Sequence, residues 1–286
     1  TLAQAPNNLV TIQLSDGSSP GNQTYYAQGN MPRLIISNTS GTQNLTQLND
    51  LFVLGNFTQQ GTGTLDVNNF NLSLNSAISI TGPAKINATA LNSRLTFCSG
   101  AVASINPANL TLGQISNLDI YNSLNAGVPA TFTFSSGVQV NNSCGLYCAD
   151  VRVTSGALTL GKGSGDFTLN VGTYAATGIE PTMNLGSGVN RVKYLALGNN
   201  GNLVTAQKEI LATYTQPVIL SLNNSVGVSI NKVVAVDELQ LIYGSFRTGA
   251  LTPIYVTGTT PGKVSGGSAY AFVSGPLKRA LPAGAS

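Results

Sequence analysis

Apolar and polar residues alternate along many short segments of this chain, and one such pattern recurs. Residues 151–160 show Val and Leu at alternate positions around a Gly, residues 239–246 largely repeat this order, and residues 57–67 follow it more loosely. Side chains of a β-strand point alternately to opposite faces, so the alternation predicts pleated strands with one buried face. Its repetition predicts layers of strands stacked along an axis.

Gly, Asn and Pro divide the chain into apolar runs that have the length of strands and are too short for helices. The predicted strands are Leu9–Leu14, Arg33–Ser37, Phe70–Leu74, Ala77–Ile80, Arg94–Cys98, Thr131–Phe134, Phe167–Val171, Pro217–Leu222, Val226–Ile230, Val233–Val236 and Pro253–Val256. We therefore expect an all-β protein in which helix is almost absent.

A longer unit is superimposed on these runs. Leu34, Leu118 and Leu195 lie in strands that end in an Asn-bearing turn, and they are 84 and 77 residues apart. The spacing predicts an N-terminal strand or cap region over residues 1–30 and three β-repeat modules over residues 31–116, 117–191 and 192–286, the last with the start of a further C-terminal strand region.

Two architectures accommodate such runs, a parallel β-solenoid of stacked coils and a tandem array of antiparallel β-sandwich domains. Short Gly- and Asn-containing corners, without long crossovers or Pro-rich linkers, favour the solenoid, with coils of about 20–28 residues. Asn199, Asn200 and Gly201 form a hairpin signal that favours antiparallel pairing at one place.

Composition indicates a folded chain with few charges. Hydrophobic residues make up 42% of the 286 residues, whereas charged residues make up 8%, against about a quarter in most globular proteins. Thirty Asn and 32 Gly residues supply turns and polar positions instead. The net charge of +3 is scattered, so we expect no nucleic-acid partner, and no apolar run is long enough to predict a membrane span.

The chain contains no histidine, which excludes Ser-His-Asp and Cys-His catalytic arrangements. Paired carboxylates can cleave a polysaccharide, but Asp237 and Glu238 are the only adjacent acidic residues, and alternation along a strand would direct them to opposite sides. Asp150 and Asp237 precede the two alternating segments, which suggests equivalent corners. We therefore predict no catalytic residues, no cofactor, no metal site and no enzymatic activity.

Three cysteines allow one disulfide. Cys144 and Cys148 are a candidate disulfide, because a turn can close their spacing and an exported chain would oxidise them. Cys98 lies in an apolar run and is expected to be a small buried residue. Residues 1–5 are compatible with the tail of an export cleavage site or with a loop.

Ten tyrosines provide aromatic rings that can stack on sugars. The candidates for carbohydrate contact are Tyr25, Tyr26, Tyr243, Tyr255 and Tyr270. Half-buried strand tyrosines would account for the same residues without a ligand.

The closing stretch, residues 269–286, contains an aromatic residue and Val ahead of Gly275-Pro276-Leu277-Lys278-Arg279, followed by Pro282-Ala283-Gly284. It resembles a segment that recurs in large Bacteroidota cell-surface β-repeat adhesin and filament proteins, and the alternating segments are similar to their repeat regions. The resemblance implies export by the type IX secretion system, exposure on the cell surface and an adhesive, filamentous or gliding-associated role. The strand that follows in those proteins is missing here, which suggests a part of a longer protein.

We therefore expect a non-enzymatic, extracellular structural or adhesive β-repeat segment of a cell-surface protein. Its expected partners are other cell-surface proteins or copies of itself, with a polysaccharide as a further candidate. Two alternatives remain: a filament subunit that donates strand Leu9–Leu14 to its neighbour, and a carbohydrate-binding, lyase-like solenoid.

Overall fold

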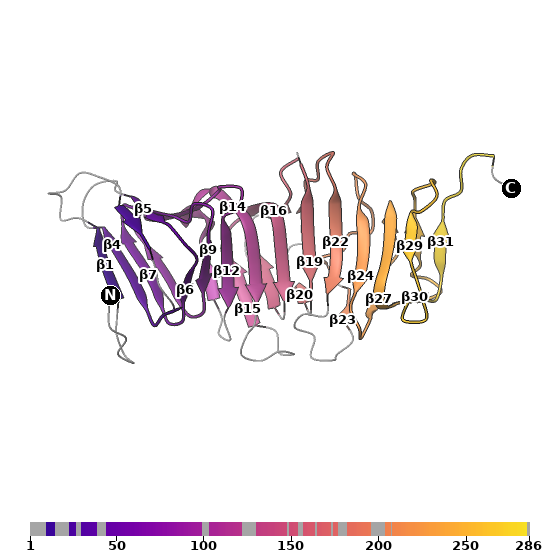
Figure 1. Ribbon diagram of the computed structural model, residues 1–286, viewed down its shortest axis with the longest axis horizontal. Helices are drawn as coiled ribbons and strands as arrows, with labels where there is room; N and C mark the ends of the chain where they lie inside the picture. The colour runs from indigo at the N-terminus through magenta and orange to yellow at the C-terminus, as the bar shows by residue number, and fades with distance from the viewer. Residues whose placement is uncertain are drawn as a thin grey trace.

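The computed structural model of the chain is a rod of stacked strands that lie across its long axis (Figure 1). It describes residues 10–14, 23–26, 30–38, 44–98, 103–121, 130–147, 149–153, 157–163, 165–172, 174–176, 182–195, 204–206 and 208–284. Every pairing between the named strands is parallel. The predicted parallel β-solenoid is confirmed, and the alternative of tandem antiparallel sandwiches is wrong.

The strands of successive coils stack into three parallel sheets. We call these sheets the first, second and third faces, in the order in which the chain passes through them. The first face holds β1 (Val10–Leu14), β4 (Leu34–Asn38), β7 (Phe57–Gly61), β10 (Ile78–Thr81), β13 (Ala103–Ile105), β15 (Ala130–Phe134), β17 (Ala149–Val153), β20 (Tyr174–Ala176), β23 (Val204–Thr205), β25 (Val228–Ile230), the second half of β27 (Glu238–Thr248) and β30 (Ala271–Ser274).

The second face holds β2 (Gln23–Tyr25), β5 (Asn44–Gln47), β8 (Thr64–Asp66), β11 (Lys85–Ala88), the first halves of β14 (Leu110–Tyr121) and β16 (Val138–Tyr147), β18 (Leu158–Leu160), β21 (Thr182–Met183), β26 (Val234–Val236), β28 (Ile254–Val256) and β31 (Leu277–Arg279). The third face holds β3 (Asn30–Met31), β6 (Leu51–Val53), β9 (Asn71–Leu74), β12 (Arg94–Cys98), the second halves of β14 and β16, β19 (Phe167–Val171), β22 (Asn190–Leu195), β24 (Ile219–Asn223), the first half of β27 and β29 (Val264–Gly266). In the described part of the chain the only helix is the 3-10 turn η1 (Pro107–Asn109), and no helix there is long and apolar enough to cross a membrane.

The core consists of side-chain columns that follow the strand registers from coil to coil. The first column of the third face contains Leu51, Leu72, Leu95, Leu118, Cys144, Leu169, Val192, Leu220, Leu239 and Val264. The second contains Met31, Val53, Leu74, Phe97, Ile120, Leu146, Val171, Tyr194, Leu222, Leu241 and Gly266. Burial of one such aliphatic side chain contributes about 1.5–3 kcal/mol, so these columns are a main source of stability.

Buried amide side chains close the corners between faces. Gln59 is buried in an otherwise apolar position and donates from Nε2 to the backbone carbonyl of Lys85, at 2.9 Å, in the next coil. Asn224 donates in the same way to the carbonyl of Leu195, at 3.1 Å. Backbone carbonyls that turn out of a ladder need another donor, and an amide supplies two N–H groups. The high Asn content is thus explained in part by the corners.

The predicted strand positions are confirmed, with boundaries that differ by at most two residues. The coil length, taken from register partners, ranges from 18 residues (Val228 to Phe246) to 29 (Ala103 to Phe132), close to the expected range. The hairpin signal at Asn199 lies outside the described residues.

The equivalence of the two alternating segments is wrong. Residues 151–153 lie on the first face and 158–160 on the second, whereas 239–241 lie on the third face and 246 on the first. Asp150 is accordingly in β17, and Asp237 lies between β26 and β27. Any two strands joined by a corner show the same alternation of apolar and polar residues. The pattern therefore cannot indicate between which two faces a segment lies. The ladders also run without a break through residues 117 and 191, and the three-module division stays a prediction.

Candidate functional site

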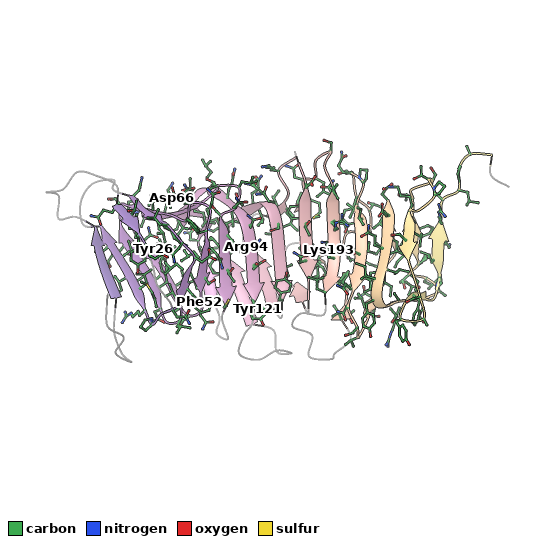
Figure 2. The ribbon with its side chains drawn as sticks, viewed as in Figure 1. Tyr26, Phe52, Asp66, Arg94, Tyr121 and Lys193 are labelled. Carbon is green, nitrogen blue, oxygen red and sulfur yellow. The ribbon has the colours of Figure 1, made fainter. Side chains whose placement is uncertain are left out.

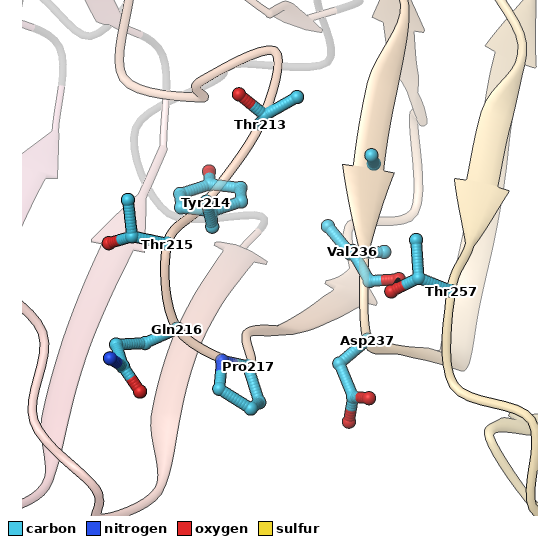
Figure 3. A pocket seen from close by; sticks show the side chains of 9 residues that line it. Thr213, Tyr214, Thr215, Gln216, Pro217, Val236, Asp237 and Thr257 are labelled. Atoms are coloured by element: carbon cyan, nitrogen blue, oxygen red, sulfur yellow. Dashed lines mark hydrogen bonds between the residues drawn. The ribbon is translucent and has the colours of Figure 1, made fainter.

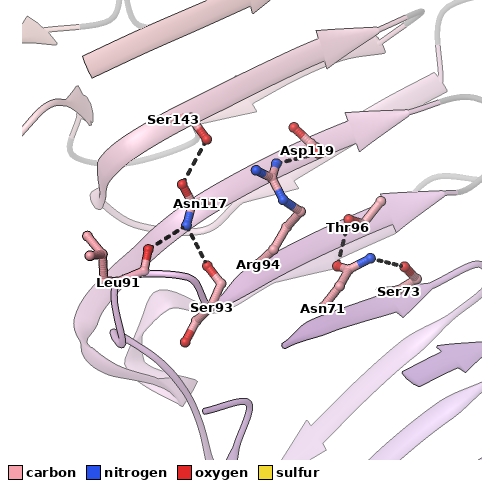
Figure 4. A network of polar contacts seen from close by, with 9 residues as sticks. All are labelled: Asn71, Ser73, Leu91, Ser93, Arg94, Thr96, Asn117, Asp119 and Ser143. Carbon is pink, nitrogen blue, oxygen red and sulfur yellow. Dashed lines mark hydrogen bonds and ion pairs between the residues drawn. The ribbon is translucent and has the colours of Figure 1, made fainter. Parts of the chain in front are cut away.

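Outward side chains of the third face form a polar network over β9, β12, β14 and β16 (Figure 4). Nη1 of Arg94 lies 2.6 Å from Oδ2 of Asp119. Asn71 donates to Oγ of Ser73 and accepts from Oγ1 of Thr96, both at 2.9 Å. These groups bind one another from coil to coil, so the network braces the outer surface of the ladder.

The thiol and phenol groups near Asp119 keep their protons at neutral pH. Burial raises the pKa of the Cys98 thiol to about 11, and the nearby charge of Asp119 adds to the shift. Burial and the same carboxylate also raise the pKa of the Tyr147 hydroxyl. A side chain at Gly145 would overlap both Asp119 and the Tyr147 ring, so these groups fill the space above that position. The thiol and the phenol are thus held in their neutral forms.

A second charged cluster contains two carboxylates, against the expectation from the sequence. Nζ of Lys263 lies 2.6 Å from Oδ2 of Asp237 and 3.6 Å from Oε2 of Glu238. The prediction that the two acids face opposite sides is wrong, because Asp237 lies in the corner between two strands, where alternation does not hold. The hydrogen bond to Asp237 is the main cause that raises the pKa of Lys263. The amine therefore stays cationic and is not a base at neutral pH.

Hydrogen bonds extend this cluster over the third face. Nε2 of Gln240 donates to Oε1 of Glu238, at 2.7 Å, and Nη1 of Arg191 donates to Oε1 of Gln240, at 2.9 Å. Both oxygens of Glu238 thus have a partner. The carboxylate is positioned as part of a brace between coils.

A cleft of about 330 Å³ lies beside Asp237 (Figure 3). Tyr214 and Pro217, from an irregular segment of the coil before β24, form one side, and Val236 and Thr257 form the other. Within this segment the hydroxyl of Tyr214 accepts a hydrogen bond from the backbone N–H of Leu211, at 3.1 Å. The polar lining and small size suit a single small polar molecule.

The most exposed aromatic surface lies at the corner between the third and first faces of the last two coils. Tyr243 and Tyr270 are 47% and 72% exposed, and their neighbours Ile242 and Phe272 are 59% and 45% exposed. The backbone N–H of Gly244 donates to the carbonyl of Tyr270, at 2.6 Å, which places the tyrosines at equivalent positions of adjacent coils. We name Ile242, Tyr243, Tyr270 and Phe272 the aromatic ridge. Its two tyrosines were among the predicted carbohydrate contacts.

The other three predicted contacts lie apart from the ridge. Tyr25 is partly buried and donates to Sδ of Met31, at 3.3 Å. Tyr26 is 62% exposed and lies toward the N-terminal end of the rod (Figure 2). Tyr255 is on the second face, where Nζ of Lys278 lies 5.0 Å from its ring centroid and 3.0 Å from its hydroxyl. The structure therefore brings together two of the five candidates, and sequence reasoning missed the flanking Ile242 and Phe272.

The cysteines are core residues in the part of the chain that the structure describes. Cys144 has a free, fully buried thiol between Leu118 and Leu169 in the first column of the third face. Cys148 lies outside the described residues, so the predicted bridge between the two is not described. Cys98 is free and buried, as predicted.

No group of three or more His, Cys, Asp or Glu side chains that could hold a metal ion occurs among the described residues. Comparisons of the chain with protein-family models, with curated proteins and with solved structures find no match.

Proposed function

We propose that the chain is a non-enzymatic, rod-shaped structural segment that acts outside the cell and holds an adhesive surface. The observation that carries this proposal is the first column of the third face. Its ten positions from Leu51 to Val264 are joined by nine strand spacings, which at about 4.8 Å each give about 43 Å of continuous packing. A load along the rod would be spread over many stacked coils.

The outer surface supports the same role. Arg94 with Asp119, and Lys263 with Asp237, join residues of adjacent coils by ion pairs, so charged groups are used as braces. The resemblance of residues 269–286 to segments of Bacteroidota surface proteins supports display on the cell surface. The same resemblance supports export through the type IX secretion system. Other surface proteins or copies of the chain are the expected partners.

Rigidity can be tested by energy transfer between dyes on the third face. Thr96 and Ser265 occupy the same outward row, seven strand spacings apart, so cysteines there should be separated by about 34 Å. The variant Thr96→Cys/Ser265→Cys, with the native cysteines replaced by alanine, should give one narrow distance distribution. A broad distribution would contradict a rigid segment. Cleavage of a polysaccharide that is lost in Asp237→Asn would contradict the non-enzymatic role.

The aromatic ridge favours carbohydrate binding as a second function. Tyr243 and Tyr270 are exposed on adjacent coils, about 4.8 Å apart along the rod, a spacing at which two rings can contact one sugar chain. On a glycan array, Tyr243→Ala/Tyr270→Ala should lose binding that the control Tyr26→Ala retains. Equal glycan binding by the parent chain, the double variant and Tyr26→Ala would show that the aromatic ridge is not the binding site.

A further inference from the structure

The second face is interrupted between β21 and β26, because the described residues of the coil between them form no strand there. The backbone N–H groups of Ala235 and Asp237, two residues apart, donate to the carbonyls of Ala212 and Val218, both at 3.0 Å, which are six residues apart. Between two such bonds a regular parallel ladder advances by two residues on each strand, so four extra residues leave the ladder here. We name residues 213–217 the arch.

Buried side chains on both sides of the arch hold it in place. Ile210 before the arch and Val218 after it are completely buried in the core. Buried Glu209 accepts a hydrogen bond from the hydroxyl of Tyr194, at 2.7 Å. The hydroxyl of Tyr214, in the arch itself, accepts a backbone hydrogen bond from the same segment. A segment held in this way has little conformational freedom to lose when a ligand binds, which favours binding.

The cleft beside Asp237 lies between the arch and the strands that follow (Figure 3). Tyr214 and Pro217 supply ring surfaces from the arch, and Asp237 and Thr257 supply polar groups from the opposite side. Ala235 also lines the cleft, and its two neighbours in β26 are buried, so its methyl group points outward into this space. Ring surfaces combined with a few convergent polar groups are typical of small-molecule sites.

The polar groups opposite the arch require a ligand that donates hydrogen bonds. Oδ2 of Asp237 binds Lys263, whereas Oδ1 has no partner among the described residues. A carboxylate can only accept hydrogen bonds. The hydroxyl of Thr257 donates to the carbonyl of Val236, at 3.0 Å, so its oxygen is left to accept. Hydroxyl groups of a ligand can supply the donors for both oxygens.

The charges at the cleft select a neutral ligand. Nζ of Lys263 lies 2.6 Å from Oδ2 of Asp237, so this ammonium group would repel a cation placed at Oδ1. An anion at the same place would be repelled by the carboxylate. A neutral molecule with several hydroxyl groups avoids both penalties, and its C–H surface can pack on the rings of Tyr214 and Pro217. Sugars combine these properties.

We propose that the cleft binds one ring of a neutral sugar, whose hydroxyl groups donate to Oδ1 of Asp237 and to Oγ1 of Thr257. Asp237 lies at the corner between the second and third faces, whereas the aromatic ridge lies between the third and first faces. The site is therefore separate from the aromatic ridge. The inference goes beyond the proposed rod and stands without a glycan on the ridge.

Two variants with matched controls test the site. Ala235→Phe fills the cleft from an outward position of a strand, where an aromatic residue is well tolerated, and Ser229→Phe adds the same ring on the first face of the same coil. Asp237→Ala removes the accepting oxygen. Glu238→Ala removes the other carboxylate that binds the same lysine but does not line the cleft. Thermal unfolding followed by circular dichroism shows whether each variant is folded.

Saturation-transfer NMR titrations measure the dissociation constants of glucose, galactose, mannose and N-acetylglucosamine, with glucuronate and glucosamine as charged analogues. The parent chain should bind at least one neutral sugar with a Kd of about 0.1–10 mM, and more tightly than both charged analogues. Ala235→Phe should abolish this binding, and Asp237→Ala should weaken it at least about tenfold. Glu238→Ala and Ser229→Phe should remain within about twofold of the parent chain.

A parent chain that binds none of the neutral sugars, or that binds a charged analogue more tightly, would overturn the proposal. Binding that is unchanged in Ala235→Phe would do the same. If Ala235→Phe does not fold, equal binding by Asp237→Ala and Glu238→Ala would overturn it. Binding that is lost only in Tyr243→Ala/Tyr270→Ala would place the sugar on the aromatic ridge and would also reject the cleft.

Discussion

Removal of the Asn117 amide should loosen the middle of the rod. Asn117 is buried at the corner inside β14, where Nδ2 donates to the carbonyls of Leu91 and Ser93, both at 2.9 Å. Its Oδ1 accepts from Oγ of Ser143 in the next coil, at 2.8 Å (Figure 4). One side chain therefore connects three successive coils. The variant Asn117→Ala removes all three hydrogen bonds and leaves the backbone able to keep its ladder.

The expected loss of stability follows from what each partner retains. The carbonyl of Leu91 still accepts from Nδ2 of Asn142, at 3.1 Å, and the carbonyl of Ser93 still accepts from the backbone N–H of Asn117, at 3.2 Å. Neither carbonyl is left without a donor, so each lost bond counts at its net value of about 1 kcal/mol. The hydroxyl of Ser143 is partly exposed and can turn to water. The free energy of unfolding should therefore fall by about 2–3 kcal/mol.

Urea unfolding and hydrogen exchange together test this value. Because a solenoid can unfold in parts, exchange in the peptides that contain β12, β14 and β16 should accelerate more than exchange elsewhere. Ser143→Ala removes one of the three bonds and should lower the free energy of unfolding by about 0.5–1.5 kcal/mol. Asn231→Ala changes an exposed asparagine and serves as the control. If Asn117→Ala and Asn231→Ala were equally stable, the structural role assigned to the corner amides would be wrong.

Three further predictions concern the core, the corners and the thiols. Leu95→Ala should lower the free energy of unfolding by about 2–5 kcal/mol because it opens a cavity in a column, whereas Leu91→Ala, at a 67% exposed position, should change it by less than about 0.5 kcal/mol in the same urea assay. Gly244→Ala should prevent folding or destabilise the protein severely, since the φ of Gly244 is +96° and a Cβ there would overlap a backbone carbonyl of the preceding coil. Gly262 has a φ of +86° but faces open space, so Gly262→Ala should lower the free energy of unfolding by only about 1–2 kcal/mol. Thermal unfolding measures both variants. With a pKa near 11, the Cys98 thiol should be about 0.1% thiolate at pH 8 and should resist iodoacetamide until the pH approaches 11 or the chain unfolds; rapid labelling of the folded chain at pH 8 would contradict its burial.

Strand positions could be predicted because burial of one face imposes a period of two. Runs such as Phe167–Val171 and Arg94–Cys98 are strands with the predicted bounds, and the short Gly- and Asn-containing corners correctly favoured a solenoid over sandwiches. The role of Cys98 as a buried core residue was predicted for the same reason, since it lies in an apolar run.

The candidate sites were harder to predict, because they depend on which residues a coil brings together. Tyr243 and Tyr270 are 27 residues apart, and the register of β27 with β30 places them on adjacent coils. Lys263 approaches Asp237 and Glu238 together only because one acid lies in a corner. The alternation of apolar and polar residues predicts strands, but it does not predict the direction of side chains at corners.

The sequence by itself determined that this chain is a stack of short strands with an apolar core, few charged residues and no histidine-based chemistry. The tertiary structure alone decided which face each segment occupies and which side chains become neighbours in successive coils. The physical reason is that apolar alternation is satisfied equally well on any of the three faces, whereas the register between coils is fixed by corner geometry and by hydrogen bonds between strands whose register partners are 18–29 residues apart.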